Sequence, residues 1–200
     1  MILNTELFIE LFKPNYNDAV NYCNALCSRS NPDDGKDLLQ QSLLQSMEKF
    51  DTLKDTDKFR SWFFTIITRA FYTSLRTGFW KRFLSLDSVK DIENMQGSHS
   101  NGNDELKYVI NSALTRLSYK ERSAILLFEL GNFSIEEITQ IQHEKSISTV
   151  KSRLSRAREK LRAYILKLEN NSNIKLNNQN LIGDIENETI RLSAGLDKGK

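Results

Sequence analysis

Apolar residues recur at helical spacing along most of this 200-residue chain. The first stripe predicts an amphipathic helix that buries Ala19, Tyr22, Cys23 and Leu26. Prolines and glycines number only 2 and 8, where average composition would give roughly 10 and 14. Few helix breakers and no convincing strand pattern together predict an all-α protein.

A second apolar stripe follows a helix-start signal. In the segment Asn31-Pro32-Asp33-Asp34, Asn31 is expected at the N-cap, Pro32 at the first helical position and the acids near the positive end of the helix dipole. The buried residues of this helix are expected to be Leu39, Leu43 and Met47. The exposed side is expected to carry Asp37, Gln40, Gln41 and Leu44.

A longer stripe predicts a helix over residues 56–77. Its buried residues are expected to be Phe59, Trp62, Phe63, Ile66 and Ala70. From Asp87 to Asp104 the pattern disappears, and the polar, glycine-containing stretch DSVKDIENMQGSHSNGND predicts a flexible linker between two domains. Periodicity resumes at Leu106.

The C-terminal half contains the pattern of a helix-turn-helix. Capping boxes at Ser118-x-x-Glu121 and Ser134-x-x-Glu137 each open a helix, and a further helix starts near Ser148 after a short turn. That turn, QHEKSI, lacks the glycine that many such turns use and is one residue longer than usual. The last helix is expected to pack through Val150, Leu154, Ala157, Leu161, Ile165 and Leu168.

The ends of the chain carry weaker signals. Residues 169–200 are rich in Asn and are expected to form a loose tail, with a short amphipathic helix through Leu181, Ile185 and Leu192 as the alternative. No apolar run approaches the roughly 18 residues of a membrane span. The first residues also lack the basic-then-apolar order of a signal peptide, which favours a cytoplasmic protein with no membrane insertion.

The two cysteines lie one helical turn apart, at Cys23 and Cys27. No second cysteine pair follows, and His99 and His143 are distant in sequence, whereas a zinc site needs four ligands at recognisable spacing. Two small buried residues in a reducing compartment are therefore expected, rather than a metal or redox site. No cofactor is expected.

Charge is distributed unevenly along the chain, although the net charge is only +2. Residues 58–90 carry +6 and residues 147–169 carry +5, whereas residues 1–57 carry −5. Lys and Arg that neutralise phosphates supply most of non-specific nucleic-acid affinity, so each basic block is a candidate phosphate-binding surface. The alternative for either block is an ordinary solvated helix face.

The C-terminal basic block fits a recognition helix. Its basic residues are expected on the faces away from the apolar stripe: Lys151, Arg153, Arg156, Arg158, Lys160 and Arg162. The residues at the N-terminal tip are candidates for contact with base edges in the major groove: Ser148, Thr149, Lys151, Ser152 and Arg153. Arg156 and Lys160 lie further along and are candidates for phosphate contact.

The N-terminal basic block has a different chemistry. Between Lys58 and Leu86 there are six basic residues, no acidic one and many aromatic rings. Cations that follow a backbone beside rings that accept unstacked bases are typical of single-stranded nucleic-acid binding. Trp62 is expected in the core, whereas Tyr72, Phe79 and Trp80 are expected at the surface.

Several segments resemble the second and fourth conserved regions of bacterial RNA polymerase sigma factors, of the extracytoplasmic-function group. The matching segments are DLLQQSLLQSMEKF, FRSWFFTIITRAFYTSLR, ALTRLSYKERSAILLFELGNFSIEEITQIQ and STVKSRLSRAREKLR. The resemblance covers about residues 5–168. It implies a region 2-like domain at 1–86, a linker at 87–105, a region 4-like helix-turn-helix domain at 106–168 and a tail at 169–200.

The resemblance also implies a role for each surface. Core-polymerase binding would fall to Asp37, Gln40 and Gln41. Binding of the minus-ten element and its melted strand would fall to Arg60, Arg69, Tyr72, Arg76, Trp80, Lys81 and Arg82. The helix from Ser148 would read the minus-thirty-five element as duplex. Core RNA polymerase and promoter DNA are then the partners, and an anti-sigma factor is a further partner that the family admits.

The chain departs from the family at three positions. Arg69 stands where the family usually has the Asn that helps to hold a flipped minus-ten base, and Thr73 stands where an Asp is frequent. A guanidinium can still stack on a base or bind phosphate, so Arg69 implies an altered pocket and base preference. Ser118 replaces the usual Pro at the start of region 4 and keeps a good N-cap.

We therefore expect an initiation factor that acts by binding and is not an enzyme, since better binding of the melted strand than of the duplex would open a promoter without chemistry. Two alternatives stay open at the level of sequence. One is a conventional transcription regulator that uses only its helix-turn-helix on duplex DNA. The other is a sigma-like adaptor that binds polymerase without melting DNA.

Overall fold

The computed structural model describes residues 2–28, 33–76 and 109–171, and every regular element in these ranges is helical. The all-α prediction is confirmed. The chain divides into two compact units, an N-terminal one with the helices up to Arg76 and a C-terminal one with the helices from residue 109 onward. The predicted linker and the tail from residue 172 lie outside the described residues.

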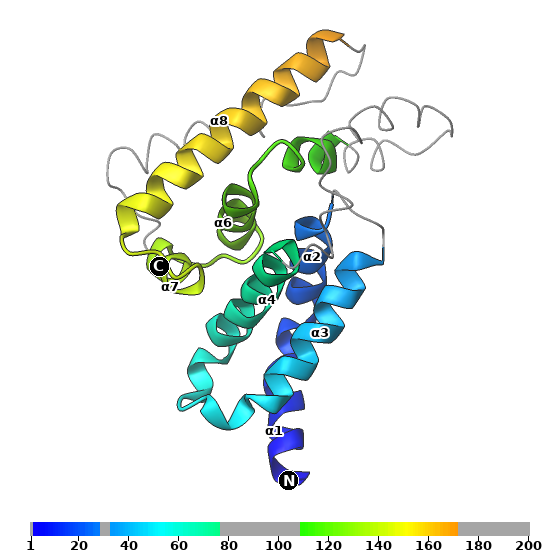
Figure 1. Cartoon of the computed structure of the whole chain (residues 1–200), viewed down its shortest axis with the longest axis vertical. Coiled ribbons are helices and arrows are strands. Elements are labelled where there is room, and N and C mark those ends of the chain that lie inside the picture. The colour runs from blue at the N-terminus through cyan, green and yellow to red at the C-terminus, as the bar shows by residue number, and fades with distance from the viewer. Residues whose placement is uncertain (1, 29–32, 77–108, 172–200) are drawn as a thin grey trace. The chain divides into compact units, whose positions relative to one another are not determined.

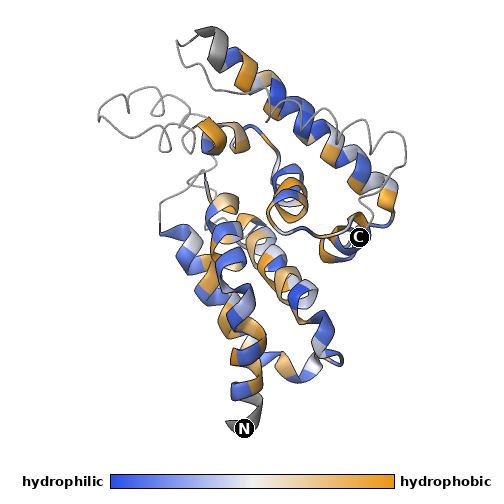
Figure 2. Cartoon of the chain, turned by 180° about the vertical axis from the view of Figure 1, so that it is seen from behind, coloured by the Kyte–Doolittle hydropathy of each residue, from blue (hydrophilic) through white to orange (hydrophobic). Residues whose placement is uncertain are grey.

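The N-terminal unit is a helical bundle in which α2, α3 and α4 pack side by side (Figure 1). Helix α1 also packs against α4. Short 3-10 turns connect α1 to α2 and α3 to α4. The helices are α1 (Ile2–Phe12), α2 (Tyr16–Leu26), α3 (Asp34–Glu48) and α4 (Phe59–Arg76). Polar and apolar residues occupy different sides of each helix, as Figure 2 shows, and the apolar sides meet in the core.

Aromatic rings dominate the core of the N-terminal unit. Phe63 on α4 is fully buried and stacks on Phe59, while the ring of Phe12 meets it edge-on. Phe8 of α1 meets Phe59 edge-on, and Tyr22 of α2 packs against Phe64 of α4. Ring pairs at such separations stabilise a core beyond the area that they bury.

One buried hydrogen bond links two helices of this core. The hydroxyls of Tyr22 on α2 and Thr68 on α4 lie 2.9 Å apart, and Thr68 also donates to the carbonyl of Phe64. Burial raises the pKa of the Tyr22 phenol, with the nearby Tyr72 as a smaller contribution in the same direction. The phenol therefore stays protonated and serves the fold.

Helix α3 lies against α2 at a glycine. A Cβ at Gly35 would come within 2.9 Å of the Cα of Asn24 and closer still to its side chain. Backbone atoms cannot move aside as a side-chain end can, so a residue with no Cβ is required for α2 and α3 to approach this closely. Gly35 thereby sets the position of the first turn of α3.

The predicted stripes of the N-terminal unit are largely confirmed. Ala19, Tyr22, Cys23 and Leu26 are all buried, and so are Phe59, Phe63, Ile66 and Ala70 of α4. Trp62 is half-buried, packed against Phe50 and Phe59.

In α3 the predicted stripe is only partly right. Leu39 is buried, Leu43 is half-buried, and Met47 is 48% exposed. Leu38 is buried in place of Met47, because the contact face of α3 is centred one residue away from the predicted stripe. The predicted helix start was also early: α3 begins at Asp34 with Asp33 at its N-cap, while Asn31 and Pro32 lie outside the described residues.

The two cysteines behave as small core residues. Cys23 and Cys27 are both buried and unbonded to each other. Burial raises the pKa of the Cys23 thiol, and the neighbouring Cys27 raises it further. A protonated thiol is a poor nucleophile and a poor metal ligand, so the pair contributes packing.

The C-terminal unit consists of a helical turn at residues 109–114 and the helices α6 (Tyr119–Glu129), α7 (Ile135–Ile141) and α8 (Ile147–Asn171). Helix α8 packs along α6, and its apolar residues Val150, Leu154 and Ala157 are fully buried. Val109 and Ala113 form a small cluster with Ile165 further along α8. The predicted helix-turn-helix is therefore confirmed as α7, a turn and α8.

Both predicted capping boxes are present. Ser118 accepts a hydrogen bond from the backbone of Glu121, whose carboxylate accepts one from the backbone of Ser118. Ser134 and Glu137 repeat this arrangement before α7. Each box satisfies two backbone donors that a helix start would otherwise leave without partners.

In the turn between α7 and α8, a histidine takes the position at which a glycine is common. His143 has φ 52°, the left-handed conformation that usually favours glycine. The amide of His143 donates to the carbonyl of Gln140, and the amide of Glu144 donates to that of Thr139. These two bonds form a Schellman motif, which ends α7 cleanly and turns the chain toward α8.

Candidate functional site

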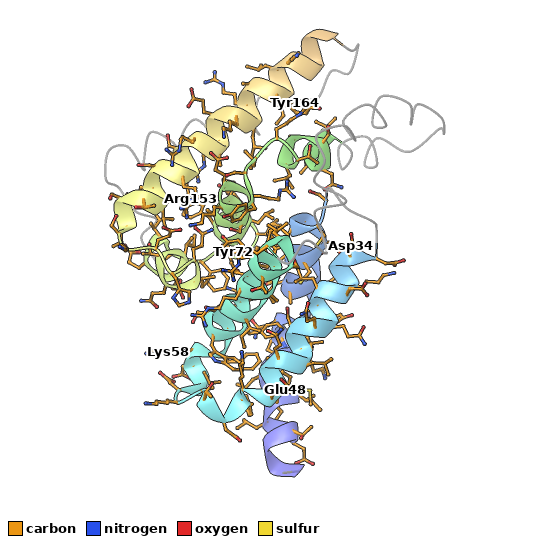
Figure 3. All side chains as sticks on the ribbon, in the orientation of Figure 1. Asp34, Glu48, Lys58, Tyr72, Arg153 and Tyr164 are labelled. Carbon is orange, nitrogen blue, oxygen red and sulfur yellow. The ribbon has the colours of Figure 1, made fainter. Side chains whose placement is uncertain are left out.

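The exposed side of α3 carries the residues predicted to face a partner. Asp37, Gln40 and Gln41 are all exposed, and Leu44 beside them is 59% exposed. Leu38 and Leu39 hold the opposite side of the helix in the core. Figure 3 labels the two ends of this helix at Asp34 and Glu48. The arrangement presents three polar side chains around one apolar one, which suits a protein partner.

On α4 the basic residues have different environments. Arg60 donates to Asp18 of α2 at 2.7 Å and lies over the ring of Phe64, so part of its charge is already neutralised within the unit. Arg69 and Arg76 are exposed further along the helix, with Tyr72 half-buried between them. Trp80, Lys81 and Arg82 lie outside the described residues.

The first turns of α8 present an outward row of polar side chains. Ser148, Ser152 and Arg156 follow one another at four-residue spacing and are all exposed. Thr149 and Lys151 beside them are half-buried. This row lies on the side of α8 opposite to the buried stripe, as a recognition helix requires.

The start of α8 is organised by a serine that the sequence analysis missed. Ser146 accepts a hydrogen bond from the amide of Thr149, which caps the helix. Its hydroxyl also lies 2.7 Å from that of Ser148 and 3.1 Å from that of Thr149. The signal was available, because a serine directly before the first helical residue is a standard N-cap.

Two arginines of α8 were expected on exposed faces, and this expectation is wrong. Arg153, labelled in Figure 3, is 7% exposed and donates to Glu144 at 2.9 Å. Arg158 is 1% exposed, donates to Glu129 at the end of α6 and lies over the ring of Phe128. An arginine can bury its long stem among apolar residues when an acid meets its head group, and both arginines do so here.

Lys160 is likewise held by an acid. Its ammonium lies 2.8 Å from both carboxylate oxygens of Glu121, the residue that completes the capping box of α6. Burial alone would raise the pKa of Glu121, but the hydrogen bonds from Lys160 and Ser118 lower it below its ordinary value. The Lys160 side chain is half-exposed, and its charge is directed at α6.

Glu144 in the turn holds two cations at once. Its Oε1 accepts from Nζ of Lys120 on α6 and from Nη2 of Arg153 on α8, each at 2.9 Å. Burial alone would raise the pKa of Glu144, but these two partners lower it. No spacing rule would have paired Glu144 with residues 24 positions before it and 9 after it.

An exposed polar row on a helix-turn-helix, together with a helix that carries exposed arginines in a separate unit, is the arrangement expected of a nucleic-acid-binding protein. Comparison with known proteins agrees. The family description "Sigma-70 region 2" matches residues 11–80, and "Sigma-70, region 4" matches residues 109–161. The first match covers α2, α3 and α4, and the second covers α6, α7 and most of α8.

Two curated relatives are similar over most of their length. RNA polymerase sigma factor SigV of Bacillus subtilis is 27% identical over 137 residues, 68% of this chain and 79% of the relative. The ECF RNA polymerase sigma factor EcfG of Rhodopseudomonas palustris is 28% identical over 149 residues, 70% of this chain and 76% of the relative.

Solved structures share the fold. The sigma factor RpoE of Bartonella quintana, in complex with the anti-sigma factor NepR, matches with a TM-score of 0.56 and 24% identity over 78% of this chain and 97% of its own. CnrH in complex with the cytosolic domain of CnrY matches with a TM-score of 0.57 and 20% identity, over 82% and 95%.

The chain belongs to the sigma-70 family of RNA polymerase sigma factors, in the extracytoplasmic-function group. It is an alternative sigma factor that directs transcription initiation, and its partners are core RNA polymerase and promoter DNA. The family consists of transcription factors that act by binding. None of the helices in the described residues is long and apolar enough to cross a membrane.

Proposed function

We propose that the outward row on α8 reads the upstream, minus-thirty-five element of the promoter as duplex DNA. The observation that carries this proposal is the exposure of Ser148, Ser152 and Arg156 on one side of a helix that is otherwise held by a buried stripe. Ser148 and Ser152 lie near the N-terminus of α8, where side chains reach base edges, and Arg156 lies where phosphate contact is expected.

Two residues that were predicted to contact DNA have a different role in this proposal. Arg153 and Lys160 face Glu144 and Glu121 within the unit, so positioning of α8 is the role that their ion pairs support. Thr149 and Lys151 flank the outward row and remain candidates for base contact. Direct reading therefore falls to fewer residues than the basic composition of α8 suggests.

We propose that the exposed face of α3 binds core polymerase through Asp37, Gln40 and Gln41. Their exposure around Leu44 supports this assignment, and so does the close packing of α3 on α2 at Gly35. The same proposal assigns the melted minus-ten strand to Arg69, Tyr72 and Arg76 of α4 and to the segment that follows. Arg60 supports α4 through its pair with Asp18.

The proposal is tested with full-length protein, core polymerase and a genomic fragment library in run-off transcription. Mapped start sites define the promoters, and absence of specific starts would contradict sigma activity of this chain. Asp37→Ala with Gln40→Ala is expected to weaken core binding at least tenfold while the helical circular dichroism stays unchanged, because both residues are exposed. Lys36→Ala, an equally exposed change on α3, is the matched control.

Duplex reading and strand melting are separated with two further variants. Ser152→Ala on a promoter mapped with the wild type is expected to lower binding of the upstream duplex and to leave melting of a pre-bound promoter unaffected. Tyr72→Ala is expected to lower the yield of permanganate-reactive thymines in the open complex at saturating protein. A conventional duplex regulator would lose nothing with Tyr72→Ala, and an adaptor would support no transcription at all.

We further propose that the chain acts by binding alone, in the cytoplasm. We also propose that an anti-sigma factor binds it and inhibits it until it is needed. One structural neighbour is a sigma factor in complex with the anti-sigma factor NepR, which supports the proposal by analogy of fold. A protein captured on this chain from an extract of its own cells should abolish run-off transcription when it is added to the purified reaction, and unchanged transcription would contradict the analogy.

A further inference from the structure

The turn of the helix-turn-helix is longer than usual and carries no glycine, so something else must fix the direction in which α8 leaves it. Backbone hydrogen bonds end α7 at His143 and Glu144. They do not reach α8, whose first turn is capped locally by Ser146. Between these two locally ordered ends, the Glu144 side chain spans from the turn to both neighbouring helices.

Glu144 is placed to fix that direction. Its Oε1 bonds Arg153, two turns into α8, and Lys120, in the first turn of α6. The Arg153 side chain is 8% exposed and that of Glu144 is 13% exposed, so this pair is shielded from water and from salt. The carboxylate therefore ties the turn, the scaffold helix and the recognition helix at one point.

We propose that Glu144 is a positioning residue for promoter recognition: it aims the outward row of α8 at the base edges. This inference rests on the proposed reading of duplex DNA by α8. Glu144 itself contacts no DNA in this arrangement, because its effect passes through the two cations that it holds.

Loss of the carboxylate then acts on DNA binding in two ways. Without Glu144 the direction of α8 is less well fixed, so the base contacts of the outward row are lost more often. The removal of one negative charge acts on every duplex alike, because it reduces repulsion from phosphates. Affinity for the promoter element therefore falls relative to affinity for any other sequence.

The test compares Glu144→Gln with wild type as full-length protein bound to core polymerase. The probes are a duplex carrying the upstream element of a promoter mapped with the wild type and a duplex of the same composition with that element scrambled. Glu144→Gln is expected to bind the promoter duplex about tenfold more weakly, the loss of one good base contact. It is expected to bind the scrambled duplex at least as tightly as wild type does, so the ratio of the two affinities falls about tenfold or more.

Glu136→Gln is the matched control, because Glu136 is exposed in the first turn of α7 and the change in net charge is the same. This control should change the binding of both duplexes by the same factor. A parallel loss of affinity for both duplexes by Glu144→Gln would show a purely structural role and overturn the proposal. Equal gains for both duplexes would show a pure charge effect and would overturn it as well.

Glu144→Asp keeps the inference testable if the glutamine variant does not fold. Aspartate retains the charge but is one methylene shorter and cannot reach both cations, so specificity should fall without a gain in non-specific binding. Unchanged specificity of folded Glu144→Asp would overturn the positioning role. Ser152→Ala separates the proposed reading of DNA by α8 from the positioning role of Glu144. If Ser152→Ala leaves promoter binding intact, the reading by α8 is contradicted. If Ser152→Ala lowers promoter binding and the Glu144 variants do not, only the role of Glu144 is contradicted.

Discussion

The two units of this protein are held together by different interactions. In the N-terminal unit, rings from α1, α4 and a connecting turn surround Phe63 and Phe59, and the ion pairs in the described residues lie at the surface. In the C-terminal unit, α8 is fixed to α6 and to the turn by ion pairs that each have at least one buried member. One unit is stabilised chiefly by rings, the other by rows of charges around an aliphatic core.

This difference bears on how each unit uses its basic residues. On α4, Arg69 and Arg76 are exposed, whereas Arg60 pairs with an acid of another helix. On α8, three of the basic residues between positions 151 and 162 face acids of the same unit: Arg153, Arg158 and Lys160. A net charge counted along the sequence therefore overstates what α8 offers to phosphate.

The largest effect is expected from Phe63→Ala. This ring is fully buried among other rings, so its removal should lower the free energy of unfolding of the N-terminal unit by about 3–5 kcal/mol. Urea unfolding followed by tryptophan fluorescence measures it, because Trp62 and Trp80 are the two tryptophans of the chain. A loss under 1 kcal/mol would show that the ring cluster is not what holds this unit.

Acid should destabilise the C-terminal unit before the N-terminal one. The pKa values of Glu121 and Glu144 are lowered in the fold, so their interactions contribute fully above the ordinary carboxyl value of 4.5. As pH falls below 4.5 toward the lowered folded values, the carboxylates take up protons and this stability is lost. Each charged hydrogen bond is worth about 1.5–3 kcal/mol, so the effect is a few kcal/mol at most.

Thermal unfolding at pH 7 and pH 4 checks the order of the two units. At pH 4 the helical circular dichroism should show a transition that tryptophan fluorescence, which reports only the N-terminal segment, does not share. The double variant Glu121→Gln with Glu144→Gln should remove most of this pH dependence. Coincident transitions at both pH values would contradict the distinction between the units.

The smallest effect is expected from Arg158→Met, although Arg158 is almost fully buried. Two of its guanidinium nitrogens, Nε and Nη1, have no hydrogen-bond partner among the described residues. Its acid partner Glu129 is half-exposed and can return to water. A buried ion pair of this kind contributes little over a well-packed apolar side chain. The free energy of unfolding, measured by thermal unfolding, should therefore change by less than about 1 kcal/mol in either direction. A loss above about 3 kcal/mol would show that the pair is essential.

Apolar periodicity predicted most of this fold because the helices are separated by clear polar segments. The stripe at Ala19, Tyr22, Cys23 and Leu26 and both capping boxes were readable from spacing alone. Met47 failed because the buried face of α3 runs through Leu38, Ser42 and Ser46, and a stripe that follows only apolar residues misses the two buried serines. An apolar stripe predicts which side of a helix is buried, but not where small polar residues complete the contact face.

The candidate site was predicted less completely. The exposed residues of α3 and the outward row of α8 follow from the same periodicity, since they are the complement of the buried stripes. Arg153 and Arg158 did not follow, because a pattern of apolar residues treats every arginine as a surface residue. Their burial depends on acids that lie elsewhere in the chain, on α6 and in the turn, and such pairs form only when the fold brings them together.

The capping box of α6 also has a consequence for how the C-terminal unit opens. The first turn of a helix usually frays within the native state, since its amides are the least protected. Here the carboxylate that closes the cap on Ser118 is the one that holds Lys160 on α8. The start of α6 therefore cannot fray without breaking the pair with Lys160, and we expect hydrogen exchange at the first amides of α6 to be as slow as exchange in α8.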